Sequence, residues 1–431
     1  MTAETVFTYG APDLKFGPGA ADEIGFDVSR YGASRVLVIT DPGVAAAGGP
    51  QRVVDAIRGY RVHAHLFTEV HVEPTDVSLR HAVEAARADG PWDAFVAVGG
   101  GSSIDTAKAV NLLTTNPGDL MDYVNPPVGG GRAPEQPLRP LVAVPTTTGT
   151  GSESTTICVL DVLDLKVKTG ISHTALRPTL AVVDPLLTLT QPAEVTACAG
   201  LDILCHALES YTAKPYTAFD RKAPERRVPY CGANPVADMF SERALALLSG
   251  ALRKAVRDGA DLSARTDLAL AATFAGMGFG NAGVHIPHAD AYPIAGGVKE
   301  FRPPGYPDAP LVPHGMAVAL TAPEAFRFTF PADPARHLRA ASLLGGADAT
   351  GDPADLEPAA LEPAERLPAT LVALMRDIGM PNGIGAVGYT ESDVDTLVAG
   401  ALKQQRLLAT APRPAGEADL AAIFRHSLTL W

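Results

Sequence analysis

Short runs of apolar, β-branched residues alternate with helical patterns along the first 190 residues of the chain. These runs predict strands at 35–40, 63–67, 93–98, 141–144 and 180–183. Between them, apolar residues recur with helical spacing at 53–57, 77–89 and 103–113. Because helices that separate strands act as crossover connections, the pattern predicts an α/β domain built on a doubly wound, mostly parallel sheet.

The pattern changes near residue 190, where the strand-like runs end. Long amphipathic segments follow at 236–257, 262–278, 364–378 and 391–405, and two proline-rich stretches at 214–235 and 302–313 are predicted to be loops. We therefore expect two domains with a boundary near 187–193. The first, at 1–190, is an α/β dinucleotide-binding domain, and the second, at 191–431, is all-helical.

Composition narrows the classes of protein that fit this pattern. With 46% hydrophobic and 19% charged residues, the 431-residue chain is typical of a globular enzyme. Its net charge of -13 argues against a nucleic-acid partner, because phosphate binding requires a basic surface. No run of about 18 apolar residues occurs, and the first ten residues do not resemble a secretion signal. We therefore expect neither a membrane span nor a signal peptide.

The four cysteines bear on the compartment. Cys158, Cys198, Cys205 and Cys231 show neither CxxC spacing nor the pattern of a disulfide framework. Unpaired cysteines are typical of a reducing environment, so we expect a cytoplasmic protein.

A glycine-rich turn joins the strand at 93–98 to the next helix, with the sequence Gly99-Gly-Gly-Ser-Ser-Ile-Asp105. Glycines allow a diphosphate to approach the backbone, and a helix N-terminus offers oriented N–H groups to its charge. The turn lacks the GxGxxG fingerprint, and it is also explained as a tight connection capped by Ser103.

A second polar loop, Pro145-Thr-Thr-Thr-Gly-Thr-Gly-Ser-Glu153, also follows a buried strand. Loops after successive parallel strands meet at one edge of the sheet, where nucleotides bind. Asp41 ends the strand at 35–40, where a carboxylate accepts hydrogen bonds from a ribose and repels a 2′-phosphate, which favours NAD over NADP. The alternative for Asp41 is a residue that begins the turn before Pro42-Gly.

One carboxylate and three histidines stand in short motifs that contain glycine or proline. Asp202 and His206 are four residues apart, so a helix places both on one face, and His288 and His314 follow later in the chain. One oxygen and three nitrogen ligands suit Fe(II) or Zn(II), with a position left open for a substrate oxygen. Taken singly, each histidine is better explained as a hydrogen-bonded structural residue than as a ligand.

Together these segments resemble the iron-containing (group III) alcohol dehydrogenases over nearly the whole chain. Within the family, the chain is most similar to the hydroxyacid–oxoacid transhydrogenase subgroup. The supporting segments are the two loops, the four residues above, Phe16-Gly-Pro-Gly19, Val72-Glu-Pro-Thr-Asp76, the stretch from Leu204 to Tyr211, the stretch from Phe274 to His285, and Pro310-Leu-Val-Pro-His-Gly315. The resemblance implies a dehydroquinate synthase-like fold, with a dinucleotide domain followed by an all-helical domain that binds a divalent metal.

The resemblance also implies a role for individual residues. The metal ligands would be Asp202, His206, His288 and His314. The residues that contact NAD(H), in addition to Asp41, would be Gly100, Gly101, Ser102, Asp105, Thr146, Thr147, Thr150, Ser152 and, on the adenine side, Lys168.

The chain departs from many family members four residues after the third ligand. Those members have a second histidine there that is discussed as a proton carrier, and this chain has Tyr292, as the transhydrogenase subgroup does. Proton transfer is open among Tyr292, His285, the ribose hydroxyls and water. His285 lies three residues before His288 and would compete as a ligand only within a helix that Pro287 disfavours; otherwise it is a hydrogen-bonding residue.

The implied activity is a metal-dependent, NAD-linked oxidoreduction. Hydride would move between hydroxy acids such as 4-hydroxybutyrate and oxo acids or aldehydes such as 2-oxoglutarate and succinic semialdehyde, with Fe(II), or Zn(II), and NAD(H) as cofactors. A substrate carboxylate requires a cation, for which Arg226, Arg227 and Lys299 are candidates, each also explained as a solvated surface charge. We expect small-molecule partners and a homodimer or larger homo-oligomer.

Three other functions compete with this one. An NAD(P)-dependent iron-type alcohol dehydrogenase or maleylacetate-type reductase would share every motif and release NADH in each turnover. A cyclising lyase of the dehydroquinate synthase type would require a cluster of lysines and arginines beside the ligand motifs, which the sequence does not contain. A non-enzymatic scaffold would not explain why four ligand residues and two nucleotide loops occur together.

Overall fold

The computed structural model describes residues 2–165, 167–306, 308–345 and 361–431. The chain forms two compact units, an α/β unit at Ala11–Thr190 and a helical unit at Gln191–Trp431. The segment that precedes Ala11 belongs to the helical unit rather than to the α/β unit in which we expected it. Its backbone explains this, because Glu4 donates to the carbonyl of Phe219 and Gly10 donates to Asn281 Oδ1.

Six parallel strands form the sheet of the α/β unit, in the order β1-β8-β5-β4-β2-β3. These strands are β1 (Asp13–Phe16), β2 (Arg35–Ile39), β3 (His63–Phe67), β4 (Ala94–Gly99), β5 (Leu141–Pro145) and β8 (Leu180–Val183). The helices are α1 (Ile24–Arg30), α2 (Pro42–Ala46), α3 (Gly49–Gly59), α4 (Asp76–Asp89), α5 (Gly101–Thr115) and α6 (Leu120–Tyr123). The predicted doubly wound parallel sheet is confirmed.

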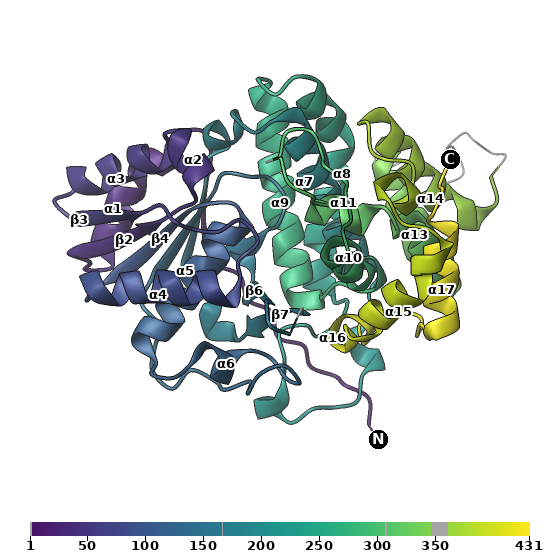
Figure 1. The fold of residues 1–431 in the computed structure, drawn as a ribbon, viewed down its shortest axis with the longest axis horizontal. Coiled ribbons are helices and arrows are strands. Elements are labelled where there is room, and N and C mark those ends of the chain that lie inside the picture. The colour runs from purple at the N-terminus through teal and green to yellow at the C-terminus, as the bar shows by residue number, and fades with distance from the viewer. Residues whose placement is uncertain (1, 166, 307, 346–360) are drawn as a thin grey trace. The chain divides into compact units, whose positions relative to one another are not determined.

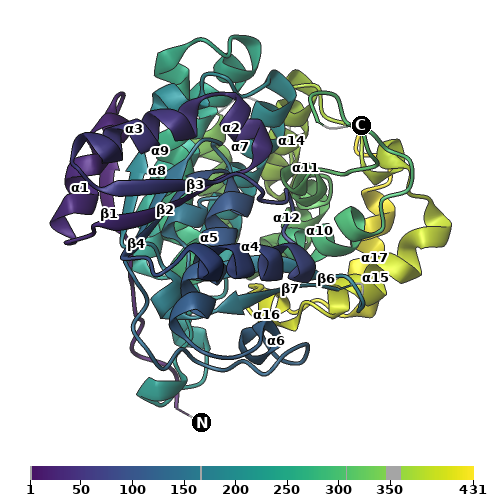
Figure 2. The ribbon, with the colours of Figure 1, turned by 60° about the vertical axis from the view of Figure 1, so that its left-hand side comes forward.

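Helices cover both faces of this sheet, which explains why its strands are apolar throughout. Alternate residues of each strand point to opposite faces, so Val36 and Val38 pack with α1 and α3, and Leu37 and Ile39 pack with α4 and α5. Figures 1 and 2 show these two helix pairs on either side of the strands.

The strand order places the two predicted nucleotide loops side by side. β4 lies between β2 and β5, so Asp41, the glycine-rich turn and the Pro145–Glu153 loop all leave the same edge of the sheet. The connection from β2 leads outward to β3, whereas the chain after β4 continues to β5 and β8 on the other side. A sheet edge where the strand order reverses in this way is the usual place for a nucleotide.

The antiparallel hairpin of β6 (Ile157–Val162) and β7 (Val167–Ser172) was absent from the sequence prediction, as was β1. β7 contains Lys168, Thr169 and Gly170, which weaken the apolar alternation by which a strand is recognised.

The helical unit is built around α7, which packs against α8, α9 and α11. Most of its buried apolar residues form one continuous core, and a smaller cluster surrounds Phe279. The helices are α7 (Ala193–Thr212), α8 (Pro235–Arg257), α9 (Leu262–Ala282), α10 (Ile286–Gly296), α11 (His314–Ala319), α12 (Ala322–Thr329), α13 (Pro334–Leu344), α14 (Pro363–Asp377), α15 (Val394–Leu402), α16 (Gln405–Leu408) and α17 (Glu417–His426). The predicted helical segments at 236–257, 262–278 and 364–378 are confirmed, whereas the segment predicted at 391–405 consists of a short 3₁₀ turn at Glu391–Asp393 followed by α15 and the start of α16. Among the described residues, no helix is both long enough and apolar enough to cross a bilayer.

Candidate metal centre and nucleotide loops

Helix α7 carries both residues of the predicted helical pair. Asp202 and His206 lie one turn apart on its buried side, and both side chains are almost fully enclosed. Gly315, which follows His314, allows α11 to approach α7, because a Cβ at this position would lie 2.0 Å from the carbonyl oxygen of Cys198. The sequence Pro313-His-Gly315 therefore places a histidine at the start of α11, directly against Asp202.

Three imidazole nitrogens surround one carboxylate oxygen in this unit. Nε2 lies 3.7 Å from Asp202 Oδ1 in His206, 3.6 Å in His288 and 3.7 Å in His314. The donor atoms of Asp202, His288 and His314 all lie within 4.8 Å of one another. These distances are too long for hydrogen bonds. They fit ligands that share one ion, since two tetrahedral ligands about 2.1 Å from an ion are about 3.4 Å apart.

Unsatisfied polar atoms at this cluster also fit a metal. Asp202 Oδ1 and His288 Nε2 are buried and have no hydrogen-bond partner. A buried polar atom without a partner is costly, and coordination of an ion satisfies both atoms at once. His314 is the most exposed of the four ligand candidates, with 31% of its side chain accessible. The cluster is therefore open on the side of α11.

Glu209, one further turn along α7, holds His288 in place. Its Oε1 accepts a hydrogen bond of 2.6 Å from His288 Nδ1, and its Oε2 accepts from the backbone N–H of His285 at 2.6 Å. The first contact leaves Nε2 of His288 as the nitrogen that faces Asp202, an arrangement typical of metal-bound histidines. Sequence reasoning missed this role, although Glu209 lies seven residues after Asp202 and therefore on the same helix face.

The charges of the cluster are strongly coupled. Burial raises the pKa of Asp202, but the three imidazoles outweigh burial and hold it below its usual value. Burial lowers the pKa of His206 to about 3. Burial also opposes the charged form of His288, yet Glu209 and Asp202 prevail and raise its pKa to about 9. The cluster therefore stabilises positive charge at His288, where an ion would supply it.

Of the two residues predicted to carry a proton, His285 immediately precedes α10 and Tyr292 lies within it. His285 precedes the helix, because Pro287 fits only its first turn, and its ring is buried with Nε2 3.0 Å from Thr212 Oγ1. Burial lowers the pKa of His285 to about 4. Tyr292 is half-buried one turn after His288 and packs in a small apolar cluster with Phe279, whose ring stacks on His206 at 3.9 Å.

In the α/β unit, the two nucleotide loops interlock. Helix α5 begins at Gly101, two residues before the predicted start at Ser103. A Cβ on Gly100 would lie 3.0 Å from Thr147 Oγ1, and a Cβ on Gly101 would lie 2.9 Å from Thr150 Cγ2. The glycines are therefore required for the packing of one loop on the other, a reason that is separate from diphosphate binding.

A buried lysine fixes the second loop from beneath. Lys108 donates to the carbonyls of Ser152 at 2.9 Å and Ile157 at 2.7 Å, and it lies 3.4 Å from Asp105 Oδ1. Asp105 also accepts from Ser152 Oγ at 3.3 Å and from the backbone of Val159 at 2.9 Å. Both members of this pair hold the loop in shape, and Lys108 was missed because its acceptors lie far along the chain.

The remaining predicted cofactor residues lie in these two loops or next to them. Thr146 Oγ1 is buried without a hydrogen-bond partner. Asp41 caps α2 by accepting from Val44 N at 2.9 Å, and it accepts from Ser103 Oγ at 3.3 Å. Ser102 Oγ accepts from the backbone of Glu73 at 3.0 Å.

Lys168, predicted on the adenine side, lies on β7 and pairs with Glu73 and, at 3.4 Å, with Asp161. Its ammonium group is therefore already neutralised by carboxylates of the α/β unit.

We expect Gly101→Ala to lower the stability of the α/β unit by about 1–3 kcal/mol, because the new methyl group overpacks Thr150. We also expect roughly tenfold weaker NAD binding and unchanged metal content, measured by thermal unfolding, NAD titration and metal analysis. Gly59→Ala is the matched control, because no atom lies within 4 Å of its added Cβ. In the double variant with Thr150→Ala, stability should recover while NAD affinity stays low; parental NAD affinity in Gly101→Ala would contradict a phosphate-binding role.

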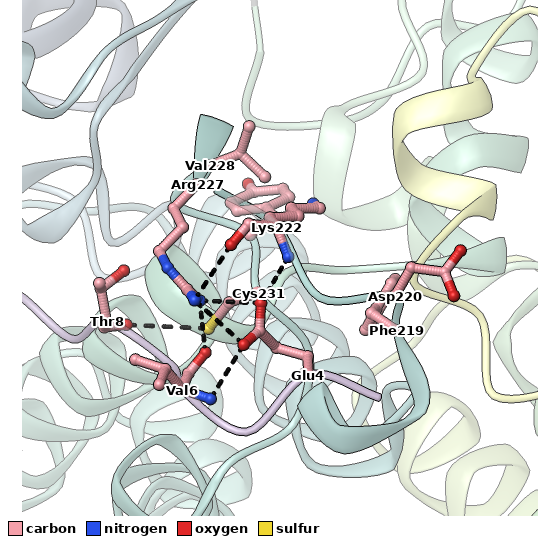
Figure 3. A pocket seen from close by; sticks show the side chains of 10 residues that line it. Glu4, Val6, Thr8, Phe219, Asp220, Lys222, Arg227, Val228 and Cys231 are labelled. Atoms are coloured by element: carbon pink, nitrogen blue, oxygen red, sulfur yellow. Dashed lines mark hydrogen bonds and ion pairs between the residues drawn. The ribbon is translucent and has the colours of Figure 1, made fainter. Parts of the chain in front are cut away.

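Two of the three candidate cations for a substrate carboxylate already have partners. Arg227 pairs with Glu4 at 2.9 Å and donates to the carbonyl of Val6 at 2.6 Å, in a small pocket beneath the N-terminal segment (Figure 3). Lys299 pairs with Asp393 at 2.7 Å. Arg226 is exposed on the loop next to Arg227. Arg227 and Lys299 therefore stabilise the fold.

Comparison with known proteins agrees with this geometry. The model of the iron-containing alcohol dehydrogenase family matches residues 11–185, and the model of the C-terminal region of the Fe-containing alcohol dehydrogenase family matches residues 228–428. The chain is 43% identical to mitochondrial hydroxyacid-oxoacid transhydrogenase of Bos taurus over 100% of this chain and 91% of the relative. It is 44% identical to the protein of the same name from Xenopus laevis, over 100% of this chain and 92% of that one.

Solved structures show the same fold. A 1,3-propanediol oxidoreductase is 32% identical with a TM-score of 0.82, and the match covers 98% of this chain and 100% of that chain. Sulfoacetaldehyde reductase from Bifidobacterium kashiwanohense, solved in complex with NAD+, is 26% identical with a TM-score of 0.79 and covers 98% of each chain. The predicted dehydroquinate synthase-like fold is confirmed.

The expected cytoplasmic location is contradicted, because the transhydrogenase relatives are named mitochondrial. Unpaired cysteines distinguish a reducing from an oxidising environment, and they carry no information about which reducing compartment holds the protein.

Family models match both units, and relatives above 40% identity match the whole chain, so the predicted recognition is confirmed. The chain is an oxidoreductase and belongs to the iron-containing alcohol dehydrogenase family.

Proposed function

We propose that the protein is a metal-dependent, NAD-linked hydroxyacid–oxoacid transhydrogenase. Hydride would pass from a hydroxy acid of the 4-hydroxybutyrate type to NAD, and from NADH to an oxo acid such as 2-oxoglutarate; succinic semialdehyde would be the aldehyde partner. The observation that carries this proposal is the ring of three imidazoles around Asp202, in a chain that matches transhydrogenases over its full length. The protein would act as a homodimer or larger homo-oligomer.

We assign the metal to Asp202, His206, His288 and His314. Three neutral nitrogens and one carboxylate suit Fe(II), the metal for which the family is named, and they also accommodate Zn(II). When bound, such an ion supplies Lewis acidity that lowers the pKa of a substrate hydroxyl and polarises a carbonyl. The role of the protein is to hold the four donors: Glu209 orients His288, and Gly315 brings His314 against α7.

We assign NAD(H) to the interlocked loops at the edge of the sheet. Gly100, Gly101 and Ser102 would present the N-terminus of the fifteen-residue helix α5 to the diphosphate. The buried Thr146 hydroxyl has no partner among the described residues, which supports a ligand at this loop. Asp105 and Ser152 would act indirectly by fixing the loop, and Asp41 would accept from the ribose.

Thr147 and Thr150 would border the diphosphate, since they pack on Gly100 and Gly101. Lys168 would contact the adenine side. The NAD+ complex of the 26% identical sulfoacetaldehyde reductase agrees with the choice of cofactor.

Tyr292 is the proposed proton carrier. It is half-buried and lies one helical turn after His288, so its hydroxyl shares the helix face of a metal ligand. His285 is the weaker candidate, because its ring is enclosed and contacts Thr212 rather than the ligand atoms.

The alternative is a dehydrogenase that releases NADH in every turnover, acting on a small alcohol. One observation favours this alternative: the similar 1,3-propanediol oxidoreductase is named for an uncharged diol.

Cofactor content separates the two functions. Retention between half-reactions requires a dissociation constant near the nanomolar range, which corresponds to about -12 kcal/mol. We therefore expect protein purified without oxygen to contain about one NAD(H) and one iron per chain after extensive dialysis. Protein that retains iron and loses all NAD(H) on dialysis would support the dehydrogenase instead.

A further inference from the structure

A cation without a carboxylate partner lies near the proposed proton carrier. Arg406, on the short helix α16, is exposed, and within the described chain no carboxylate lies within ion-pair distance of it. Its guanidinium group lies over the ring of Tyr230, 4.8 Å from the centroid. Arg227 and Lys299, in contrast, are neutralised by Glu4 and Asp393.

Tyr230 connects this cation to the metal-binding helix. The half-buried Tyr230 and Tyr292 pack against one apolar cluster that includes Phe279. Phe279 stacks on His206, and α10, which carries His288 and Tyr292, contacts α16. Contacts between aromatic side chains of the helical unit therefore link the ligand cluster to Arg406.

The spacing suits a short hydroxy acid. Tyr292 follows His288 by one helical turn, a rise of about 5.4 Å to 6 Å. Three bonded carbons separate the hydroxyl of 4-hydroxybutyrate from its carboxylate, a span of about 5 Å given C–C bonds near 1.5 Å. A substrate whose hydroxyl lies at the ligand cluster would thus place its carboxylate about one helical turn away, level with Tyr292, where Arg406 would have to extend from the Tyr230 ring to meet it.

We propose that Arg406, positioned by the Tyr230 ring, binds the remote carboxylate of the hydroxy acid and oxo acid substrates and so selects them over uncharged alcohols. This inference rests on the proposed transhydrogenase function. The planar guanidinium forms two parallel hydrogen bonds to a carboxylate, and its contact with the Tyr230 ring limits its motion before the substrate arrives. Both half-reactions use the same residue, because donor and acceptor each carry a carboxylate beyond the reacting carbon.

The test compares a charged and an uncharged substrate of equal length in Arg406→Met. Reduction of enzyme-bound NAD in a single turnover gives kcat/KM for 4-hydroxybutyrate and for 1-butanol. We expect the ratio of these two constants to fall about 100-fold, as for the loss of a hydrogen-bonded charge contact at a site built to receive it. Arg406→Lys should recover part of the ratio. Lys403→Met is the matched control, since Lys403 is an exposed cation three residues earlier in the chain, and its ratio should equal that of the parent.

Binding provides a readout that does not depend on turnover. Butyrate carries the carboxylate and lacks the reacting hydroxyl, so its dissociation constant, measured by calorimetry, should rise about 100-fold in Arg406→Met and not in Lys403→Met. An unchanged ratio with unchanged butyrate binding, or equal losses on both substrates, would overturn the role of Arg406. Parent protein that oxidises 1-butanol and not 4-hydroxybutyrate would instead overturn the transhydrogenase function itself.

Discussion

Replacing His206 by alanine is expected to remove the metal and abolish turnover while the fold remains intact. His206 is one of three imidazoles around Asp202 Oδ1, and loss of one ligand from a four-ligand site lowers metal affinity by orders of magnitude. The side chain is buried against Phe279, so its removal also leaves a small cavity that costs on the order of 1–3 kcal/mol. Metal analysis, activity and thermal unfolding together separate these two effects.

His314→Ala should behave in the same way with a smaller loss of stability, because His314 is partly exposed. The control is His426→Ala, whose ring is 70% exposed on α17 and lies outside the cluster. Normal iron content and full activity in both ligand variants would show that the cluster is a structural arrangement of histidines.

Replacing Glu209 by glutamine is expected to weaken metal binding by about 10- to 100-fold at high pH, although Glu209 is not itself a proposed metal ligand. Its carboxylate accepts from His288 Nδ1 through one oxygen and from the backbone of His285 through the other, and glutamine has only one oxygen with which to accept. The variant therefore loses the negative charge that makes the His288 ring a stronger ligand.

The deficit should depend on pH in a defined direction. In the metal-free protein Glu209 and Asp202 raise the pKa of His288 from 6.5 to about 9, so binding of an ion below pH 9 must displace a proton. Parental affinity should therefore rise with pH until about 9, whereas in Glu209→Gln it should level off at a lower pH. The difference between the two proteins is then largest near pH 9 and shrinks toward pH 6.5.

Chelator competition across this pH range measures the effect. Glu225→Gln, an exposed carboxylate on the 214–235 loop, is the matched control and should follow the parent curve. Parallel curves for Glu209→Gln and the parent would contradict the role assigned to Glu209.

The local pattern of apolar and polar residues predicted most of the fold and identified the candidate site residues. Strands buried on both faces are apolar along their length, so β2, β4 and β5 were recognisable without a structure. Asp202 and His206 were recognisable as a pair because helical spacing alone places them on one face. Pro287 correctly excluded His285 from the helix.

Contacts between distant segments could not be predicted in this way. The hydrogen bond between Glu209 and His288 joins residues 79 positions apart, and that between Lys108 and Ile157 joins residues 49 positions apart. The packing of Gly101 on Thr150 also joins distant segments. The sequence alone does not show whether this glycine is needed for contact with another loop or for contact with a phosphate. Sequence reasoning also favoured Arg226, Arg227 and Lys299 by their position on loops, whereas the partners of each cation decide which one is available to a substrate.

Turnover without added cofactor shows most directly whether the protein is a transhydrogenase. Purified protein with its own metal and NAD is mixed with 4-hydroxybutyrate and 2-oxoglutarate, and 2-hydroxyglutarate and succinic semialdehyde are measured over time. We expect both products to form continuously and in equal amounts, through many turnovers per enzyme, with no NADH released to solution. Strict dependence on added NAD, with small primary alcohols preferred over hydroxy acids, would contradict it.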